Sequence, residues 1–193
     1  MKKALILIYI VTLIYITSML IFGNLRFLIF DDFIRNILDP HTFLVFNLLG
    51  ILPFMIILYM YFYDIKLNNK NSKLIYLSFL FGGFVLYPVI FSSNIKKAKK
   101  LNNLPYINLI FITISAYTLF IFFYIEVFGD FSNYLYMFKN DILVHIMTID
   151  LMITYILSLI LIAKQEKNWY ISLIPVFGLL FLLNSKNFAI HNR

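Results

Sequence analysis

The chain is dominated by six long runs of apolar residues with very few charges. The runs cover residues 4–22, 42–63, 74–92, 107–125, 142–163 and 169–183. About 20 helical residues cross the roughly 30 Å hydrocarbon core of a bilayer, so the first five runs are long enough to span it. The sixth is marginal, because Pro175 and Gly178 interrupt it. The runs therefore predict membrane-spanning helices.

Composition agrees with this prediction. Hydrophobic residues make up 62% of the 193 positions and charged residues 13%, whereas soluble domains are about 45–50% apolar. We expect an all-α fold, a single integral membrane helical bundle over residues 1–193 with five to six transmembrane helices and the lipid bilayer as its partner. Nucleic acid is not an expected partner, because the lysines behind the net charge of +7 lie in short loops between the apolar runs.

Two of the connections are amphipathic at helical spacing. The apolar stripe of residues 27–38 consists of Phe30, Phe33, Ile34 and Ile37, and that of residues 131–140 consists of Phe131, Tyr134, Leu135 and Phe138. Such stripes predict two short interfacial helices that lie flat in the headgroup region. An ordinary aromatic loop is the alternative for each.

The distribution of Lys and Arg leaves two topologies open. If all six runs cross, the 16 basic residues divide eight against eight. If residues 74–92 instead dip into the membrane and return, the division is eleven against five, with the N-terminus cytoplasmic. The abundance of Ile, Phe, Asn, Lys and Tyr is typical of AT-rich bacterial genomes, so a bacterial cytoplasmic membrane is the expected location.

The order of elements hints at an internal duplication. A span, an interfacial helix, a capped span and a broken span occur in residues 1–92 and again in 107–183. Gly82 and Gly83 break the first half where Pro175 and Gly178 break the second. Paired broken segments are a sequence pointer to a site near the midplane of transporter-like folds. We therefore include Gly82 and Gly83 among the ligand-binding candidates.

Asp150 and His145 are the ionisable residues that stand out within the apolar runs. A carboxylate near the bilayer centre costs about 2.5–3.5 kcal/mol on insertion scales, so Asp150 should face the bundle interior, be protonated, or pair with a donor. The two residues are the candidate catalytic pair, as acid and base. One His and one Asp do not make a metal site, so no metal site is predicted.

Further polar side chains lie near this pair. Thr148 and Thr154 extend the polar face of the same helix, and Asn47 can reach it from the second run. We count these three as ligand-binding candidates. The alternative is that Asn47 and Asp150 are structural hydrogen-bonding residues that hold helices together.

Three patches resemble a known family. They read FNLLGILP at residues 46–53, SFLFGGFVLYP at 78–88 and VHIMTID at 144–150. In these patches the chain is similar to a family of uncharacterised multi-pass membrane proteins of photosynthetic bacteria and plastids. The resemblance covers residues 46–150 only. Because the activity of that family is unassigned, it draws attention to Asn47, His145 and Asp150 without implying a reaction.

Three functions remain open. The chain could bind or transport a small hydrophobic or lipid molecule at the internal polar cluster. It could instead be a membrane-embedded enzyme that uses His145 and Asp150 on a lipid or isoprenoid. It could also be a non-catalytic accessory or self-immunity protein. An enzyme should bring several polar side chains to one cavity, a transport module should show an inverted two-fold, and an accessory protein should show neither.

Overall fold

A computed structural model describes residues 2–23, 38–65, 74–92 and 106–191. All regular elements within these ranges are helical. They are α1 (Lys2–Phe22), α3 (Pro40–Phe62), α5 (Leu74–Ser92), α6 (Ile107–Phe128), α7 (Phe131–Asn140), α8 (Ile142–Gln165), the 3-10 helix η1 (Trp169–Leu173) and α9 (Phe177–His191). The all-α class is therefore confirmed for this part of the chain.

By length and composition, three of the described helices can cross a membrane. They are α3, α6 and α8. The apolar part of α1, Ile6–Phe22, is shorter than a full span. Three is fewer than the five to six transmembrane helices that the apolar runs predict. Three predicted runs are therefore not counted: the apolar part of α1 is too short, and the backbone turns within residues 74–92 and 169–183.

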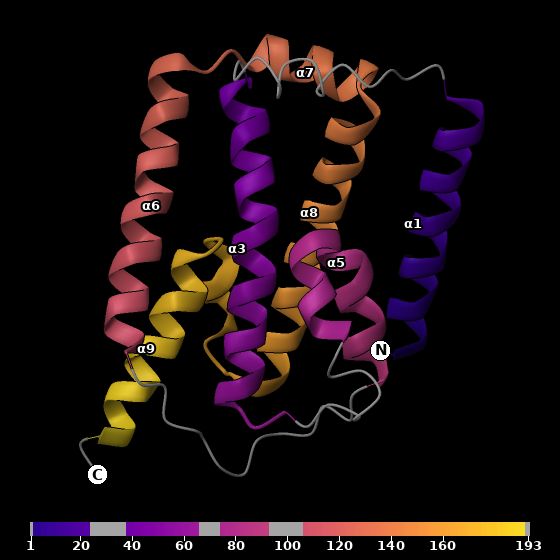
Figure 1. Cartoon of the computed structure of the whole chain (residues 1–193). Coiled ribbons are helices and arrows are strands. Elements are labelled where there is room, and N and C mark those ends of the chain that lie inside the picture. The colour runs from indigo at the N-terminus through magenta and orange to yellow at the C-terminus, as the bar shows by residue number, and fades with distance from the viewer. Residues whose placement is uncertain (1, 24–37, 66–73, 93–105, 192–193) are drawn as a thin grey trace.

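The helices α1, α3, α6 and α8 stand upright in Figure 1, and α7 lies across the upper ends of α3 and α8. Asp39 caps the start of α3 by accepting from the backbone N–H of Thr42, and Asp141 caps α8 by accepting from Leu143 and Val144. These caps satisfy N–H groups that have no partner inside a helix. They set the starts of α3 and α8 at the same side of the bundle, beside α7.

The short helix predicted at residues 131–140 is confirmed as α7, and its interfacial position stays a prediction. Its packing face differs from the predicted stripe. Met137 is buried, whereas Phe131 and Leu135 are exposed. The reason is that α7 rests on the first turns of α8 and α3, which Met137 and Tyr134 face. The second predicted interfacial helix falls almost wholly within residues 24–37, which lie outside the described residues.

Residues 74–92 do not form one straight helix. Gly82 has φ 55° and ψ −137°, which breaks α5 into two arms. The arms return to the same side of the bundle, so that α5 is a hairpin with Gly82 at its tip (Figure 1). A positive φ at this tip favours glycine, because an L side chain is strained there. The prediction of a straight span is therefore wrong, and the arrangement is the one that the re-entrant alternative requires.

Residues 169–183 also turn back instead of running straight. The Tyr155 hydroxyl donates to the carbonyl of Leu173 at 2.7 Å. Tyr155 lies ten residues before the end of α8, so η1 has climbed about 15 Å back along that helix, at 1.5 Å per residue. The chain then reverses at Pro175 and Val176, where Val176 has φ 65°, and α9 descends again. The predicted sixth span is thus a second hairpin.

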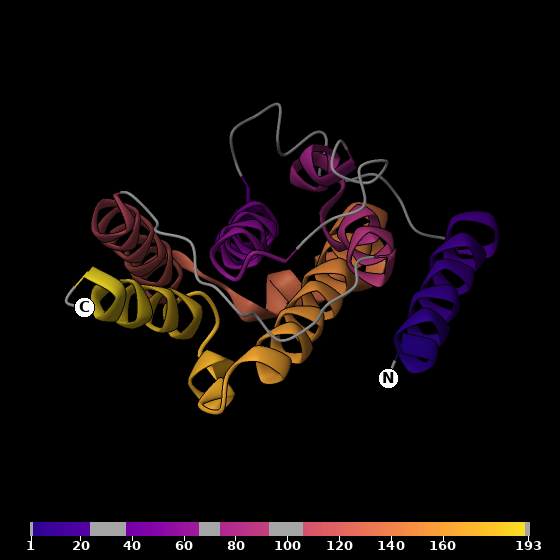
Figure 2. The same ribbon diagram turned by 90° about the horizontal axis from the view of Figure 1, so that it is seen from below.

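The two halves of the bundle repeat the same order of elements. Figure 2 shows α3 and α8 side by side at the centre, α1 and α6 at opposite outer positions, and α5 and α9 on opposite flanks. Packing follows the same pattern, since α1 contacts α5 and α6 contacts α9. Paired helices run in the same direction, so the relation is a parallel two-fold. The inverted two-fold expected of a transport module is absent from the described part of the chain.

The core lies between the central helices and the two hairpins. Its largest fully buried side chains come from α3, α5, α6, α8 and α9, and they include Tyr59, Phe62, Tyr87, Leu157, Leu161, Leu180 and Leu183. By contrast, large apolar side chains of the outer helices are exposed, such as Ile14 on α1 and Phe123 on α6. Exposed apolar surface on this scale marks a contact with lipid or protein.

Candidate functional site

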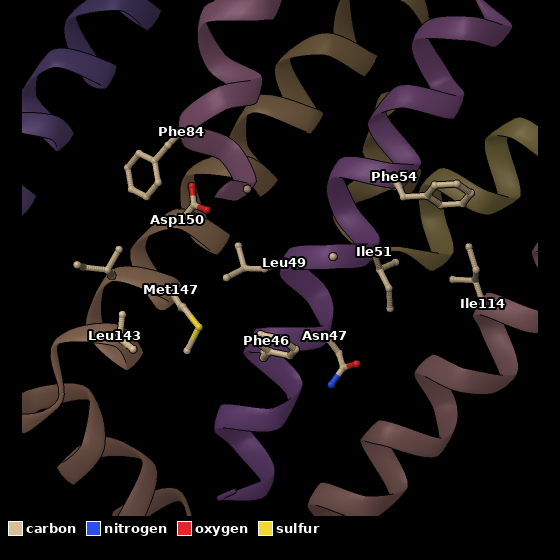
Figure 3. Close-up of a pocket in the computed structure, with 13 residues that line it drawn as sticks. Phe46, Asn47, Leu49, Ile51, Phe54, Phe84, Ile114, Leu143, Met147 and Asp150 are labelled. Carbon is tan, nitrogen blue, oxygen red and sulfur yellow. The ribbon is translucent and has the colours of Figure 1, made fainter. Parts of the chain in front are cut away.

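A cavity of about 930 Å³ lies between α3, α5, α6 and α8. Figure 3 shows the residues that surround it. They are Phe46, Asn47, Leu49, Gly50, Ile51, Phe54, Gly82, Phe84, Ile114, Leu143, Ile146, Met147 and Asp150. Of these described lining residues, only Asn47 and Asp150 have polar side chains. A volume of this size and a mainly apolar wall with few polar groups are typical of small-molecule sites.

Asp150 faces the bundle interior, as the cost of a central carboxylate predicts. Its side chain is 4% exposed. The backbone N–H of Gly83 donates to Oδ2 at 3.1 Å. Gly83 begins the second arm of α5, whose first N–H groups have no partner within the arm. Asp150 therefore caps a half-helix that starts in the middle of the bundle, and the positive end of that half-helix stabilises the carboxylate.

The glycine pair allows this close approach. A Cβ at Gly82 would overlap Asp150 Oδ2, and a Cβ at Gly83 would overlap Thr154 Oγ1 and crowd Asp150 Oδ1. Both glycines are buried. The structure thus brings together Gly82, Gly83, Asp150 and Thr154, all of which the sequence had marked as candidates.

Two oxygen atoms in this group have no hydrogen-bond partner among the described residues. They are Asp150 Oδ1 and Thr154 Oγ1, and both are buried. Burying such a group without a partner costs about 1–3 kcal/mol, so native structures rarely leave it unmet. The pair is the strongest chemical signal in the interior.

Asn47 lines the cavity but is not bonded to Asp150. Its Oδ1 accepts from the Tyr117 hydroxyl at 2.5 Å, and its Nδ2 donates to the carbonyl of Phe43 at 2.7 Å. The first of these bonds joins α3 to α6. Asn47 is therefore not the partner of Asp150, because both polar ends of the amide bind elsewhere.

His145 lies outside the cavity lining, and its two ring nitrogens have other partners. Nδ1 is 2.9 Å from the carbonyl of Phe138, and Nε2 is 2.7 Å from the Tyr15 hydroxyl. Since a carbonyl only accepts, the neutral ring carries its proton on Nδ1 and accepts from Tyr15 at Nε2. The histidine joins α8 to α7 and α1. The predicted acid and base pair of His145 and Asp150 is not formed.

Thr148 belongs to the same upper cluster as His145. Its hydroxyl donates to the carbonyl of Val144 at 2.6 Å and is 2.9 Å from the Tyr134 hydroxyl. Burial raises the pKa of Tyr134, so the phenol stays neutral and holds α7 against α8. Thr148 is therefore placed away from the cavity, because it faces α7.

Sequence reasoning missed Gly50, which lines the cavity, and Tyr117, which binds the lining residue Asn47. An ideal Cβ at Gly50 would have no atom within 4 Å, so this glycine leaves open space in the cavity wall. A lone glycine inside an apolar helix was the available signal, since it costs helix stability without a turn to explain it. Tyr117 gave no signal, because tyrosines are frequent in this chain.

No family model matches the chain, and neither the curated proteins nor the solved structures include a significant match. The resemblance of residues 46–150 to the uncharacterised membrane family therefore stays a prediction.

Proposed function

We propose that this protein binds a small hydrophobic molecule within the membrane, in the cavity beside Asp150. The observation that carries the proposal is the cavity itself, which is large and has a mainly apolar wall with a single carboxyl group, that of Asp150. An accessory or self-immunity protein has no need of such a site. Binding is favoured over acid and base catalysis, because His145 is bonded to other groups and does not line the cavity.

The fold also supports a membrane topology of four crossings and two hairpins. The crossings are α1, α3, α6 and α8, and the hairpins are α5 and η1–α9. Both hairpins enter from the side opposite α7 (Figure 1). Irregular backbone at depth is tolerated only where protein covers it, and the tip of α5 is covered by α3 and α8.

Charge gives this topology a direction. The segments that follow α3 and α5 begin at the side opposite α7 and contain several lysines, and Lys164 and Lys167 lie at or just after the end of α8 on the same side. With four crossings, thirteen of the 16 Lys and Arg residues fall at that side, and only Arg26, Arg35 and Lys139 fall at the side of α7. By the positive-inside rule, the side opposite α7 and both termini are cytoplasmic. The eight-against-eight division of the six-span alternative is replaced by a strong asymmetry.

Photolabelling can test the binding proposal. The purified protein, reconstituted in lipid nanodiscs, is irradiated with a diazirine analogue of hexadecanol, and adducts are mapped by mass spectrometry. We expect saturable labelling on cavity residues such as Phe46 and Met147, which excess unlabelled hexadecanol displaces. Labelling of the lipid-facing Leu109 should rise without saturation.

A matched pair of variants makes the test specific. Gly50→Phe places a ring in the open space of the cavity wall and should abolish the saturable labelling. Met152→Phe adds a similar ring to the opposite central helix, where the side chain is 59% exposed, and should leave it unchanged. Saturable labelling that survives Gly50→Phe, or that never appears on cavity residues, would show that the cavity is not a binding site.

A further inference from the structure

The tip of the α5 hairpin holds a buried carboxyl group that no described cationic side chain pairs with. Asp150 is buried there, and its carboxyl group accepts from the backbone N–H groups of Gly83 and Phe84. No described Lys, Arg or His makes an ion pair with it. The end of the first arm and the start of the second meet at Gly82. These ends carry only partial charges, about −0.5 and +0.5, so they cannot by themselves balance an ionised Asp150.

Two unpartnered oxygens face the same point beside Gly83. Thr154 Oγ1 and Asp150 Oδ1 lie 2.1 and 2.7 Å from the position that a Cβ of residue 83 would occupy, so they are at most about 4.8 Å apart. Both side chains are more than nine-tenths buried. Because residue 83 is a glycine, no side chain fills the region between them.

The break adds further oxygen donors. The last carbonyl groups of any helix lack partners within it, and the first arm of α5 ends next to this point. In broken membrane helices, unwound carbonyls and the carboxyl ends of half-helices coordinate Na⁺. The donor set here is one carboxylate, one hydroxyl and backbone carbonyls. It is composed of hard oxygens and carries one negative charge.

We infer that the α5 tip is a binding site for one monovalent cation, of which Na⁺ is the probe, held by Asp150 Oδ1, Thr154 Oγ1 and carbonyls of the broken helix. A single positive charge would neutralise the carboxylate and satisfy both unpartnered oxygens. A divalent cation fits less well, since such ions usually gather several carboxylates or keep bound water. The site goes beyond the proposed binding of a hydrophobic molecule, although Asp150 belongs to both.

Thermal unfolding of the purified full chain in detergent is the first test. Tm is measured in NaCl, KCl and N-methylglucamine chloride at one ionic strength. An ion that binds only the folded state stabilises it progressively as its concentration exceeds Kd. We expect Tm to rise with Na⁺ concentration and not with N-methylglucamine. The comparison between Na⁺ and K⁺ reports selectivity.

Two variants assign the effect to the site. Asp150→Asn keeps an acceptor for the Gly83 N–H but removes the charge, and Thr154→Val removes the hydroxyl while keeping the shape. Each should weaken the apparent Na⁺ affinity at least tenfold. Thr118→Val is the control, because Thr118 is equally buried but donates to the carbonyl of Ile114 at 2.7 Å on α6.

Equilibrium dialysis with ²²Na⁺ on the unaltered protein provides a measurement that does not depend on the variants folding. One bound ion per chain is expected. The cation site would be refuted by the absence of bound ²²Na⁺, by equal Tm in all three salts, or by a Na⁺ effect that survives in both site variants. None of these results bears on hexadecanol labelling, so the two proposals fail separately.

Discussion

The two hairpins of the bundle reverse direction by different means. At the tip of α5, the Gly83 N–H donates to the Asp150 carboxylate of a neighbouring helix. At the tip before α9, the N–H groups of Phe177 and Gly178 donate to the local carbonyls of Pro175 and Ile174, at 2.7 and 2.9 Å. The second hairpin is thus built from its own backbone. A hairpin in this architecture does not require a buried carboxylate.

Aligning the two central helices by their caps makes the contrast sharper. When Asp39 of α3 is matched with Asp141 of α8, Leu48 occupies the position of Asp150. Leu48 is an ordinary core residue. The frame is nearly symmetric, but the polar chemistry is on one side only. Because the second hairpin forms without a buried carboxylate, hairpin formation alone does not explain why Asp150 is present.

A labelling test of membrane topology should give the largest effect, because each introduced cysteine is either labelled or not labelled. The chain has no cysteine, so single cysteines can replace Asp64, after α3, and Tyr106, before α6. Both flank the α5 hairpin and are exposed. If α5 is a hairpin, an impermeant maleimide added to intact cells should spare both and should label Lys139→Cys on α7. Opposite labelling of Asp64→Cys and Tyr106→Cys would establish a spanning α5 and break the symmetry of the halves.

The tight glycine of each hairpin provides the next largest effect. A Cβ at Gly178 would overlap the backbone of Ile171 and Ser172, which cannot yield, whereas a Cβ at Gly83 meets the side chains of Thr154 and Asp150. Overpacking costs about 1–3 kcal/mol and sometimes more. We expect Gly178→Ala to lower the free energy of unfolding by about 3 kcal/mol and Gly83→Ala by about 1–2 kcal/mol. Unfolding in mixed detergent micelles measures both, and the reverse order would indicate that η1 is not packed on α9.

The sequence predicted much of this frame for a simple physical reason. Long apolar runs, Asp caps and the α7 stripe are local patterns, and each is sufficient to specify a helix. The repeat of elements was also visible, because the breaks at Gly82 and Pro175 fall at matching places. Run length alone, however, cannot distinguish a span from a hairpin. That distinction depends on whether α3 and α8 leave room for the Gly82 tip.

The site was less predictable than the frame. The cost of a buried charge was enough to place Asp150 in the interior. The hydrogen-bond partners of His145 could not be predicted, because Tyr15 lies far away in the sequence on α1 and Phe138 lies on α7, which runs across the start of α8. Residues five apart on one helix face different neighbours, so His145 and Asp150 separated into two clusters.

Removing the carboxylate tests how far the first hairpin depends on it. Asp150→Ala leaves the Gly83 N–H buried without an acceptor, and we expect a loss of about 1–3 kcal/mol in the free energy of unfolding. Asp150→Asn retains an acceptor and should cost less than about 1 kcal/mol. The same unfolding assay compares the two. Equal losses would show that the charge, and not the hydrogen bond to Gly83, holds the α5 tip.

Gly50→Ala should have the smallest effect, and its sign is informative. With the caps aligned, Gly50 of α3 corresponds to Met152 of α8, so the cavity wall is open in one central helix where the other carries a long side chain. No atom lies within 4 Å of an ideal Cβ at Gly50, and alanine favours a helix over glycine by about 1 kcal/mol. The variant should therefore gain up to about 1 kcal/mol in unfolding free energy, while a methyl group removes little of the cavity volume. A loss of stability instead would mean that the space beside Gly50 is occupied in the membrane. Adding hexadecanol to the assay distinguishes an empty cavity from an occupied one. If hexadecanol binds beside Gly50, the loss of unfolding free energy caused by Gly50→Ala should grow with hexadecanol concentration, and if the cavity stays empty it should not change.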